Sequence, residues 1–117
     1  MMHNADVIIV GGGAAGLMAA YSAAQAGARV RVLEKMDRPG RKLSITGKGR
    51  GNLTTANPVN KAVAAFGEGG RFLRGAFSRF YNTELIALME SLGVPLAEEQ
   101  GRRIFPVRHS AKQVADI

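Results

Sequence analysis

Cysteine is absent from this 117-residue sequence, and aromatic residues make up only 6% of it. Without cysteine the chain has no disulfide, no thiolate metal site and no redox-active cysteine pair of its own. Any redox chemistry would therefore belong to a bound cofactor. The scarcity of aromatic residues also counts against a nucleic-acid-binding module, because such modules usually add stacking platforms to their cations.

The sequence also lacks a long hydrophobic run. Its longest near-continuous apolar stretch, residues 17–28, is interrupted by Ser22, Gln25 and Gly27 and is too short for a membrane span. The first ten residues, MMHNADVIIV, have no basic flank and break into glycines too early for a signal peptide. These absences predict a cytoplasmic protein with no membrane partner.

Acidic residues are scarce: 9 Asp and Glu stand against 16 Lys and Arg, which leaves a formal net charge of +7. A positive surplus suits nucleic acid or, equally, a phosphate-bearing cofactor. We expect no nucleic-acid partner, because the sequence shows neither a basic amphipathic helix nor an RNA-binding signature. An apolar content of 46% with 21% charged residues is typical of a globular domain with a real core.

The amino-terminal third of the sequence has the pattern of a βαβ unit. In residues 5–10 the apolar residues Val7, Ile8, Ile9 and Val10 run together without a polar alternate face, as expected for a buried parallel strand. Residues 14–26 favour a helix that Gly27 ends, and residues 29–33 predict a second strand beside the first. The predicted fold class is therefore α/β, the Rossmann-type start of a doubly wound parallel sheet.

The segment GGGAAG, residues 11–16, lies between the first strand and the helix and fits the pattern G-x-G-x-x-G. Each glycine of the pattern has its own task. Gly11 would allow the sharp turn out of the strand, Gly13 the close approach of a pyrophosphate, and Gly16 the tight packing of helix on strand. The segment is thus predicted to bind the phosphates of a dinucleotide.

Three further features support this motif. The helix that begins with Ala14 and Ala15 would point its free N–H groups and its positive dipole end at the phosphates. Ala20 and Gly27 stand where helix and sheet must pack closely. Glu34 ends the second strand at the spacing of an acid that binds the adenosine ribose hydroxyls, and its charge would repel a 2′-phosphate. The site therefore favours FAD or NAD over NADP.

A second glycine-rich segment, GRKLSITGKGRGNLT, covers residues 40–54. Its glycines permit close backbone approach, and its cations suit a phosphate or a flavin ring that becomes anionic on reduction, although an ordinary solvated basic loop fits as well. We expect residues 36–55 to form a long loop. A separate loop after the acid favours the elongated FAD. An NAD-dependent dehydrogenase is the alternative enzyme, and a nucleic-acid-binding or a non-catalytic structural module is the alternative from another class.

The second half of the sequence predicts short helices and a hairpin. The expected elements are a helix with Pro58 at its first position, helices over residues 72–81 and 83–92, a hairpin around Gln100-Gly101, and a last helix opened by a capping box of Ser110 and Gln113. No metal site and no catalytic acid, base or nucleophile is predicted. His109 is expected at the surface and His3 in a terminal tail. Arg102, Arg103 and Arg108 suit a solvated face or an acidic substrate.

Two parallel strands are too few for a nucleotide-binding sheet, which needs about five or six. We therefore expect an incomplete domain whose partner is the remainder of its own chain. Residues 1–55 would form the dinucleotide-binding unit and the flavin loop. Residues 56–117 would form a truncated helical and hairpin excursion.

Four elements, VIIVGGGAAGLMAA, Glu34, GRKLSITGKGRGNLT and GRRIFPV, together resemble the amino-terminal part of the BaiN-type, aminoacetone-oxidase-like family of FAD-dependent flavoproteins. The stretch G-K-G-R-x-N-L-T is the most specific. The resemblance implies a glutathione-reductase-like fold and an FAD-dependent oxidoreductase with a small-molecule substrate, for which NAD(P)H is a candidate electron donor. Family members commonly carry cysteine where this chain has Gly51, so a role for that thiol does not carry over.

The resemblance also assigns residues to the two halves of FAD. The adenosine diphosphate half would meet Gly11, Gly13, Gly16, Glu34 and Lys35. The ribityl and isoalloxazine half would lie along Arg41, Lys42, Gly49, Arg50 and Asn52.

Overall fold

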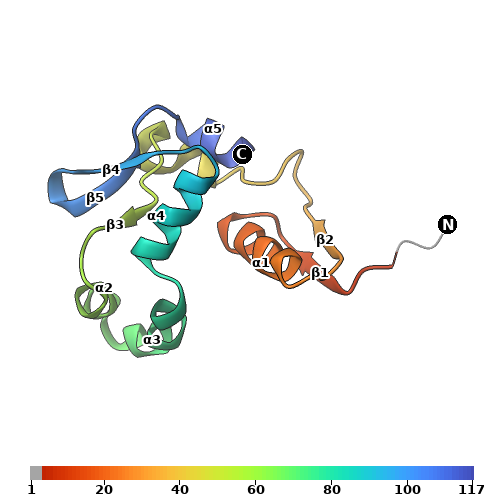
Figure 1. Cartoon of the computed structure of the whole chain (residues 1–117), viewed down its shortest axis with the longest axis horizontal. Helices are drawn as coiled ribbons and strands as arrows, with labels where there is room; N and C mark the ends of the chain where they lie inside the picture. Colours follow the sequence, from red (N-terminus) through yellow and green to blue (C-terminus); the bar gives the residue numbers. More distant parts are fainter. Residues whose placement is uncertain (1–3) are drawn as a thin grey trace.

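A computed structural model of the chain describes residues 4–117, and its first part is the βαβ unit (Figure 1). Strand β1 (Val7–Val10) leads into helix α1 (Ala14–Gln25), which returns to strand β2 (Val30–Leu33). The two strands pair in parallel, with Val7 opposite Val30 and Val10 opposite Leu33. The βαβ prediction is confirmed. Within residues 4–117, no helix combines the length and apolar character needed to cross a membrane.

Helix α1 ends where the sequence predicts, and Gly27 ends it as expected but does not pack closely against the sheet. The N–H of Ala28 donates to the carbonyl of Ala23 and that of Gly27 to Ala24, which is the bond pattern of a helix end with one residue in the left-handed conformation. Gly27 has φ +87°, and a Cβ there would meet no atom within 4 Å. The expectation of close packing at Gly27 was wrong, since the turn itself requires the glycine.

The second part of the chain joins a three-stranded antiparallel sheet, ordered β3-β5-β4, to short helices. Its elements in chain order are η1 (Leu43–Gly49), β3 (Thr54–Thr55), α2 (Val59–Ala65), η2 (Gly67–Gly69), α3 (Gly70–Arg79), α4 (Asn82–Ser91), β4 (Leu96–Glu99), η3 (Gln100–Arg102), β5 (Arg103–Pro106) and α5 (Ala111–Asp116). The hairpin and the capping box at Ser110 are confirmed. Helix α2 begins one residue after Pro58, which caps it.

The expectation of a long loop over residues 36–55 was wrong in its second half. Short 3-10 turns form η1, where the N–H of Ile45 donates to the carbonyl of Lys42 and that of Arg50 to the carbonyl of Gly47. Thr54 and Thr55 then pair with β5, which lies at the other end of the second part of the chain. Two residues are too few to show the alternation of a strand. The pairing of Thr54 and Thr55 is set instead by β5, which lies far along the chain.

The buried core is small and lies in the second part of the chain. Met89, Val94 and Val114 form its centre, and Val94 is completely buried. In contrast, α1 has no buried residue, and Val10 on β1 is 86% exposed. Parallel strands are normally covered on both faces. The βαβ unit therefore leaves apolar surface uncovered by the described residues.

Gly70 allows α3 to begin directly against the end of α2. A Cβ at Gly70 would lie 2.0 Å from the carbonyl oxygen of Val63, whereas a Cβ at Gly75, inside α3, would meet no atom within 4 Å. We expect Gly70→Ala to lower the free energy of unfolding by about 1–3 kcal/mol. Gly75→Ala should raise it by roughly 0.5–1 kcal/mol through helix propensity. Chemical denaturation measures both, and changes of the same sign would contradict this packing.

Candidate FAD-binding site

The glycine turn between β1 and α1 is held by the protein from two sides. The N–H of Gly11 donates to the carbonyl of Leu33 at 2.8 Å, and the N–H of Gly12 donates to Oε2 of Glu34 at 2.8 Å. The carbonyl of Gly12 accepts from the N–H of Gly40 at 2.7 Å. The end of β2 and the start of the basic segment, which is the glycine-rich segment of residues 40–54, therefore fix the shape of this turn.

The three motif glycines have three different surroundings. Gly11 has φ +99°, a conformation that favours glycine. A Cβ on Gly16 would lie 1.9 Å from the carbonyl oxygen of Gly11, so α1 packs closer to the strand than any side chain allows. A Cβ on Gly13 would meet no atom within 4 Å. The space over Gly13 is thus free for a phosphate group.

The first turn of α1 has the features of an anion-binding helix end. The N–H groups of Ala14, Ala15 and Gly16 make no hydrogen bond within the described part of the chain. This turn also contains no acidic residue. Free N–H groups and the positive dipole end both favour a negative charge here. The residues present therefore fit a pyrophosphate.

Glu34 stands at the end of β2 and holds the turn as well. Its Oε2 accepts from Gly12, as above, and its Oε1 accepts from the N–H of Met36 at 3.0 Å. Hydrogen bonds from the N–H groups of Met36 and Gly12 hold the pKa of the Glu34 carboxyl below its ordinary value, and the bond from Met36 has the larger effect. The positive charge of Lys35 lowers this pKa further. The spacing in the sequence predicted a ribose-binding acid but did not reveal this second contact.

The lowered pKa of Glu34 makes the stability of the turn dependent on pH. The ionised carboxylate contributes stability above the unfolded-state pKa, ordinarily 4.5, and the contribution is lost as the pH falls through the lower folded-state pKa. We expect Glu34→Gln to remove this acid-dependent step and to be less stable than wild type at neutral pH. Denaturation at a series of pH values measures both proteins, and parallel profiles would contradict the role given to Glu34.

Arg41 and Lys42 face a common hollow of about 480 Å³. The remaining lining residues are Met36, Arg38, Ser44 and Ile45. Arg41 lies 3.7 Å from Asp37, at an exposed position, while Lys42 has no ion pair within residues 4–117. The structure thus brings two predicted flavin-binding cations to one surface, a short way along the chain from Glu34.

The last predicted flavin residues, Gly49, Arg50 and Asn52, contact the β4-β5 hairpin or lead up to it. Nη2 of Arg50 lies 2.5 Å from Oε2 of Glu99, and its guanidinium carbon lies 4.4 Å from the ring centroid of Phe105. The side-chain amide of Asn52 lies against backbone carbonyls of β3 and β5, to which its nitrogen donates once the amide is turned to face them. Gly49 has φ +86°. These residues are therefore brought to the hairpin and not to the glycine turn.

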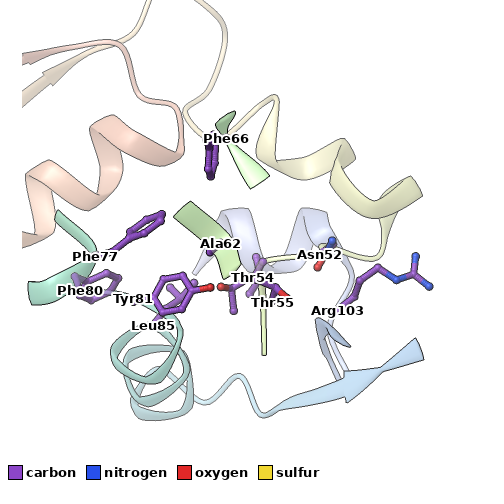
Figure 2. A pocket seen from close by; sticks show the side chains of 11 residues that line it. Asn52, Thr54, Thr55, Ala62, Phe66, Phe77, Phe80, Tyr81, Leu85 and Arg103 are labelled. Carbon is purple, nitrogen blue, oxygen red and sulfur yellow. The ribbon is translucent and has the colours of Figure 1, made fainter. Parts of the chain in front are cut away.

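A cavity of about 410 Å³ lies beside Asn52, between β3 and the helices (Figure 2). Its aromatic lining consists of Phe66, Phe77, Phe80 and Tyr81. Arg103 stands at its edge with Asn52 in Figure 2. The cavity places aromatic side chains next to the segment that is predicted to meet the flavin.

Helix α5 packs against both ends of the basic segment. A Cβ at Gly40 would lie 3.1 Å from the Cβ of Ala115, and a Cβ at Gly51 would lie 3.3 Å from the Cα of Ala111. Gly51, which replaces the cysteine common in the resembled family, also has φ +80°. The sequence predicts helix α5 but not its contacts with Gly40 and Gly51, because no local pattern links a glycine to a helix so far along the chain.

The remaining candidates form no common site. Arg102 is paired with Glu98 at 3.2 Å, and Arg103 lies over the ring of Phe105 at 5.5 Å. His109, expected at the surface, is only half exposed, and its Nδ1 is buried with no partner among the described residues. His3 lies outside the described residues. No group of His, Asp and Glu within residues 4–117 has the arrangement of a metal site.

The geometry of the glycine turn suits either FAD or NAD, and comparison with known protein families decides between the two families of proteins. The model of the HI0933-like protein Rossmann domain matches residues 5–117. The chain belongs to this family. It is a family of FAD-binding Rossmann domains of flavoproteins, so the resemblance and the α/β fold class predicted from the sequence are confirmed.

Two curated relatives match this HI0933-like chain over nearly its full length. It is 34% identical over 116 residues to the ribosomal RNA dihydrouridine synthase of Escherichia coli. The matched region covers 99% of this chain and 28% of that protein. It is 27% identical over 117 residues to the protein of the same name from Haemophilus influenzae, covering 100% of this chain and 28% of the relative. The chain thus spans about a quarter of their length. Their name includes ribosomal RNA, whereas the sequence of this chain predicts no nucleic-acid partner.

Proposed function

We propose that this chain is the amino-terminal FAD-binding part of a longer flavoenzyme. Residues 1–55 supply the dinucleotide-binding unit and flavin loop, and residues 56–117 a helical and hairpin excursion that packs on them. Two observations support the proposal that this chain is part of a longer protein. The chain covers 28% of each relative, and Val10 on the parallel strands is 86% exposed, as expected where further chain completes the sheet.

The observation that carries the proposal is the shaped turn over residues 11–16. Its backbone is held by Glu34 and Gly40, while the space over Gly13 and the first N–H groups of α1 stay free. We assign the adenosine diphosphate half of FAD to Gly11, Gly13, Ala14, Ala15, Gly16, Glu34 and Lys35. We assign the ribityl and isoalloxazine half to Arg41, Lys42, Gly49, Arg50 and Asn52.

For the substrate of the whole protein we propose ribosomal RNA, on the strength of the names of the two relatives. FAD held by these residues would, when reduced by NAD(P)H, supply the hydride that, together with a proton, would saturate the C5–C6 double bond of a uracil ring and give dihydrouridine. Within this chain, Arg50 is the cation that we assign to stabilising negative charge near the reduced ring. An enzyme acting on ribosomal RNA fits the cytoplasmic location predicted from the sequence.

Incubation of the full-length protein with NAD(P)H and a ribosomal RNA transcript tests this function. We expect mass spectrometry of the digested RNA to show dihydrouridine that depends on both FAD and NAD(P)H. A protein that holds FAD and oxidises NAD(P)H without forming dihydrouridine would overturn the RNA substrate but not the cofactor. A protein that binds no FAD would overturn both.

A further inference from the structure

Helix α3 carries three arginines and a phenylalanine at exposed positions. Arg71, Arg74 and Arg79 are exposed, and none of them has an ion pair or a side-chain hydrogen bond within residues 4–117. Phe72 between them is 90% exposed, the most exposed of the large apolar side chains in the described chain. These four residues are called the α3 outer surface below.

The opposite side of α3 faces the interior. Leu73 and Phe77 are half buried, and the ring of Phe77 lies 4.8 Å from that of Tyr81. The helix contains no acidic residue, and the nearest acids along the chain are Glu68 and Glu84. Helix α3 is thus a basic amphipathic helix, and the sequence-based expectation that none exists was wrong. In the sequence its arginines are separated by apolar residues. They come together on one side only when the chain is wound into a helix of 3.6 residues per turn, so the sequence alone does not show the pattern plainly.

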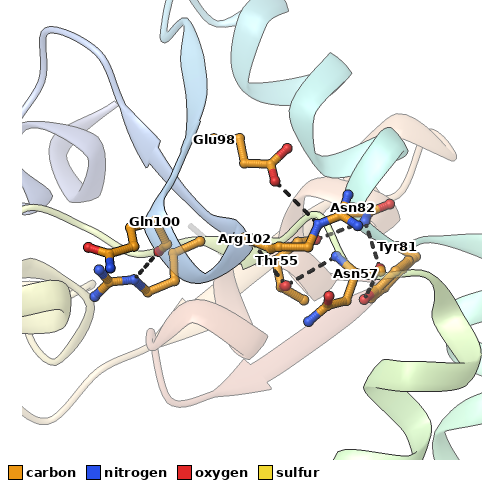
Figure 3. Close-up of polar contacts among 8 residues, drawn as sticks. Thr55, Asn57, Tyr81, Asn82, Glu98, Gln100 and Arg102 are labelled. Carbon is orange, nitrogen blue, oxygen red and sulfur yellow. Dashed lines mark hydrogen bonds and ion pairs between the residues drawn. The ribbon is translucent and has the colours of Figure 1, made fainter.

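Helix α3 is also firmly attached to the segment that follows the flavin loop. Just after it, the hydroxyl of Tyr81 donates to the carbonyl of Asn57 at 2.9 Å, and Nδ2 of Asn82 donates to the carbonyl of Thr55 at 2.8 Å (Figure 3). At its start, Gly70 packs on α2. Helix α3 is therefore anchored at its start by α2 and just beyond its end by residues 55–57.

We propose that the α3 outer surface contacts RNA, with the arginines on phosphates and Phe72 stacked on an unpaired base. This inference rests on the proposed function and adds the place in this chain where the RNA is held. Charge complementarity favours RNA, because unpaired arginines suit a phosphate backbone. An aromatic side chain this exposed next to cations is the combination that single-stranded nucleic acid binds.

Binding of a labelled ribosomal RNA transcript to the FAD-loaded full-length protein, measured over a range of salt concentrations, tests the arginines. The variant Arg71→Gln/Arg74→Gln/Arg79→Gln is expected to raise Kd at least about tenfold and to lower the slope of log Kd against log salt by about 2–3. The matching triple Arg→Lys variant should keep the slope. Lys112→Gln, which removes one cation from α5, should leave Kd within about twofold of wild type.

The role of Phe72 is tested separately. Phe72→Ala is expected to raise Kd about fivefold or more without changing the salt slope, because stacking is lost while the phosphate contacts remain. Phe72→Tyr keeps an aromatic ring and should bind RNA as wild type does. Equal weakening by both substitutions would contradict stacking.

The outcomes separate this inference from the function on which it rests. RNA binding by the wild type that is unchanged in the arginine and Phe72→Ala variants would overturn the inference alone. Absence of RNA binding by the FAD-loaded wild type would overturn the RNA substrate as well. Melting temperatures that fall in the glutamine and alanine variants would show that further chain covers this surface, which also overturns the inference.

Discussion

Replacing Gly16 with alanine is expected to abolish FAD binding by the full-length protein. The new Cβ would lie 1.9 Å from the carbonyl oxygen of Gly11, so either the turn must open or α1 must move away from β1. Both movements displace the N–H groups that the phosphates need. We expect a purified variant without flavin and a loss of about 3 kcal/mol in the free energy of unfolding.

Gly13→Ala is the matched control for this variant. Gly13 has φ −77°, which alanine adopts freely, and its Cβ would meet no protein atom. The fold should therefore stay intact, while the methyl group occupies the space assigned to the pyrophosphate and weakens FAD binding roughly tenfold or more, about 1.4 kcal/mol. Titration calorimetry and thermal melting separate the two effects. Full FAD affinity in Gly13→Ala would place the pyrophosphate elsewhere.

Replacing Arg50 with alanine is expected to lower the reduction potential of the flavin. Loss of a cation beside the reduced, negatively charged ring should shift the potential by roughly 30–60 mV, which for two electrons is about 1.4–2.8 kcal/mol. The substitution also removes the 2.5 Å contact with Glu99 and the packing on Phe105. FAD affinity should therefore fall as well, because the hairpin no longer holds the loop.

Two variants separate charge from structure at Arg50. Arg50→Lys keeps the charge and should keep the potential near that of wild type. Glu99→Gln breaks the ion pair but leaves the cation, so it should raise the potential while loosening the hairpin. Spectroelectrochemistry of the full-length proteins measures all three. An unchanged potential in Arg50→Ala would mean that Arg50 only clamps the loop to the hairpin.

The βαβ unit could be predicted from the sequence because its signals are local. The apolar run of residues 7–10, the glycine spacing and the acid at Glu34 all lie within one crossover, where turn geometry and helix packing act between near neighbours. The capping box at Ser110 was predictable for the same reason, since its two bonds span three residues.

The remainder of the site depends on contacts between distant parts of the chain. The bond from Gly40 to Gly12, the packing of α5 and the pairing of β3 with β5 leave no trace in any short window of sequence. The exposure of Phe72 is also a tertiary property, because a phenylalanine in a helix is more often part of a core. The geometry of the glycine turn is therefore predictable from the sequence, whereas the contacts of residues 40–54 with the hairpin and with α5 are not.

If this chain builds the FAD-binding part of a flavoenzyme, the full-length protein holds FAD when purified, and its visible absorption spectrum reveals this. We predict the two absorption bands of a bound flavin, which denaturation releases as FAD. A colourless protein that takes up no added FAD would show that residues 11–16 do not build an FAD site, even if the protein bound NAD.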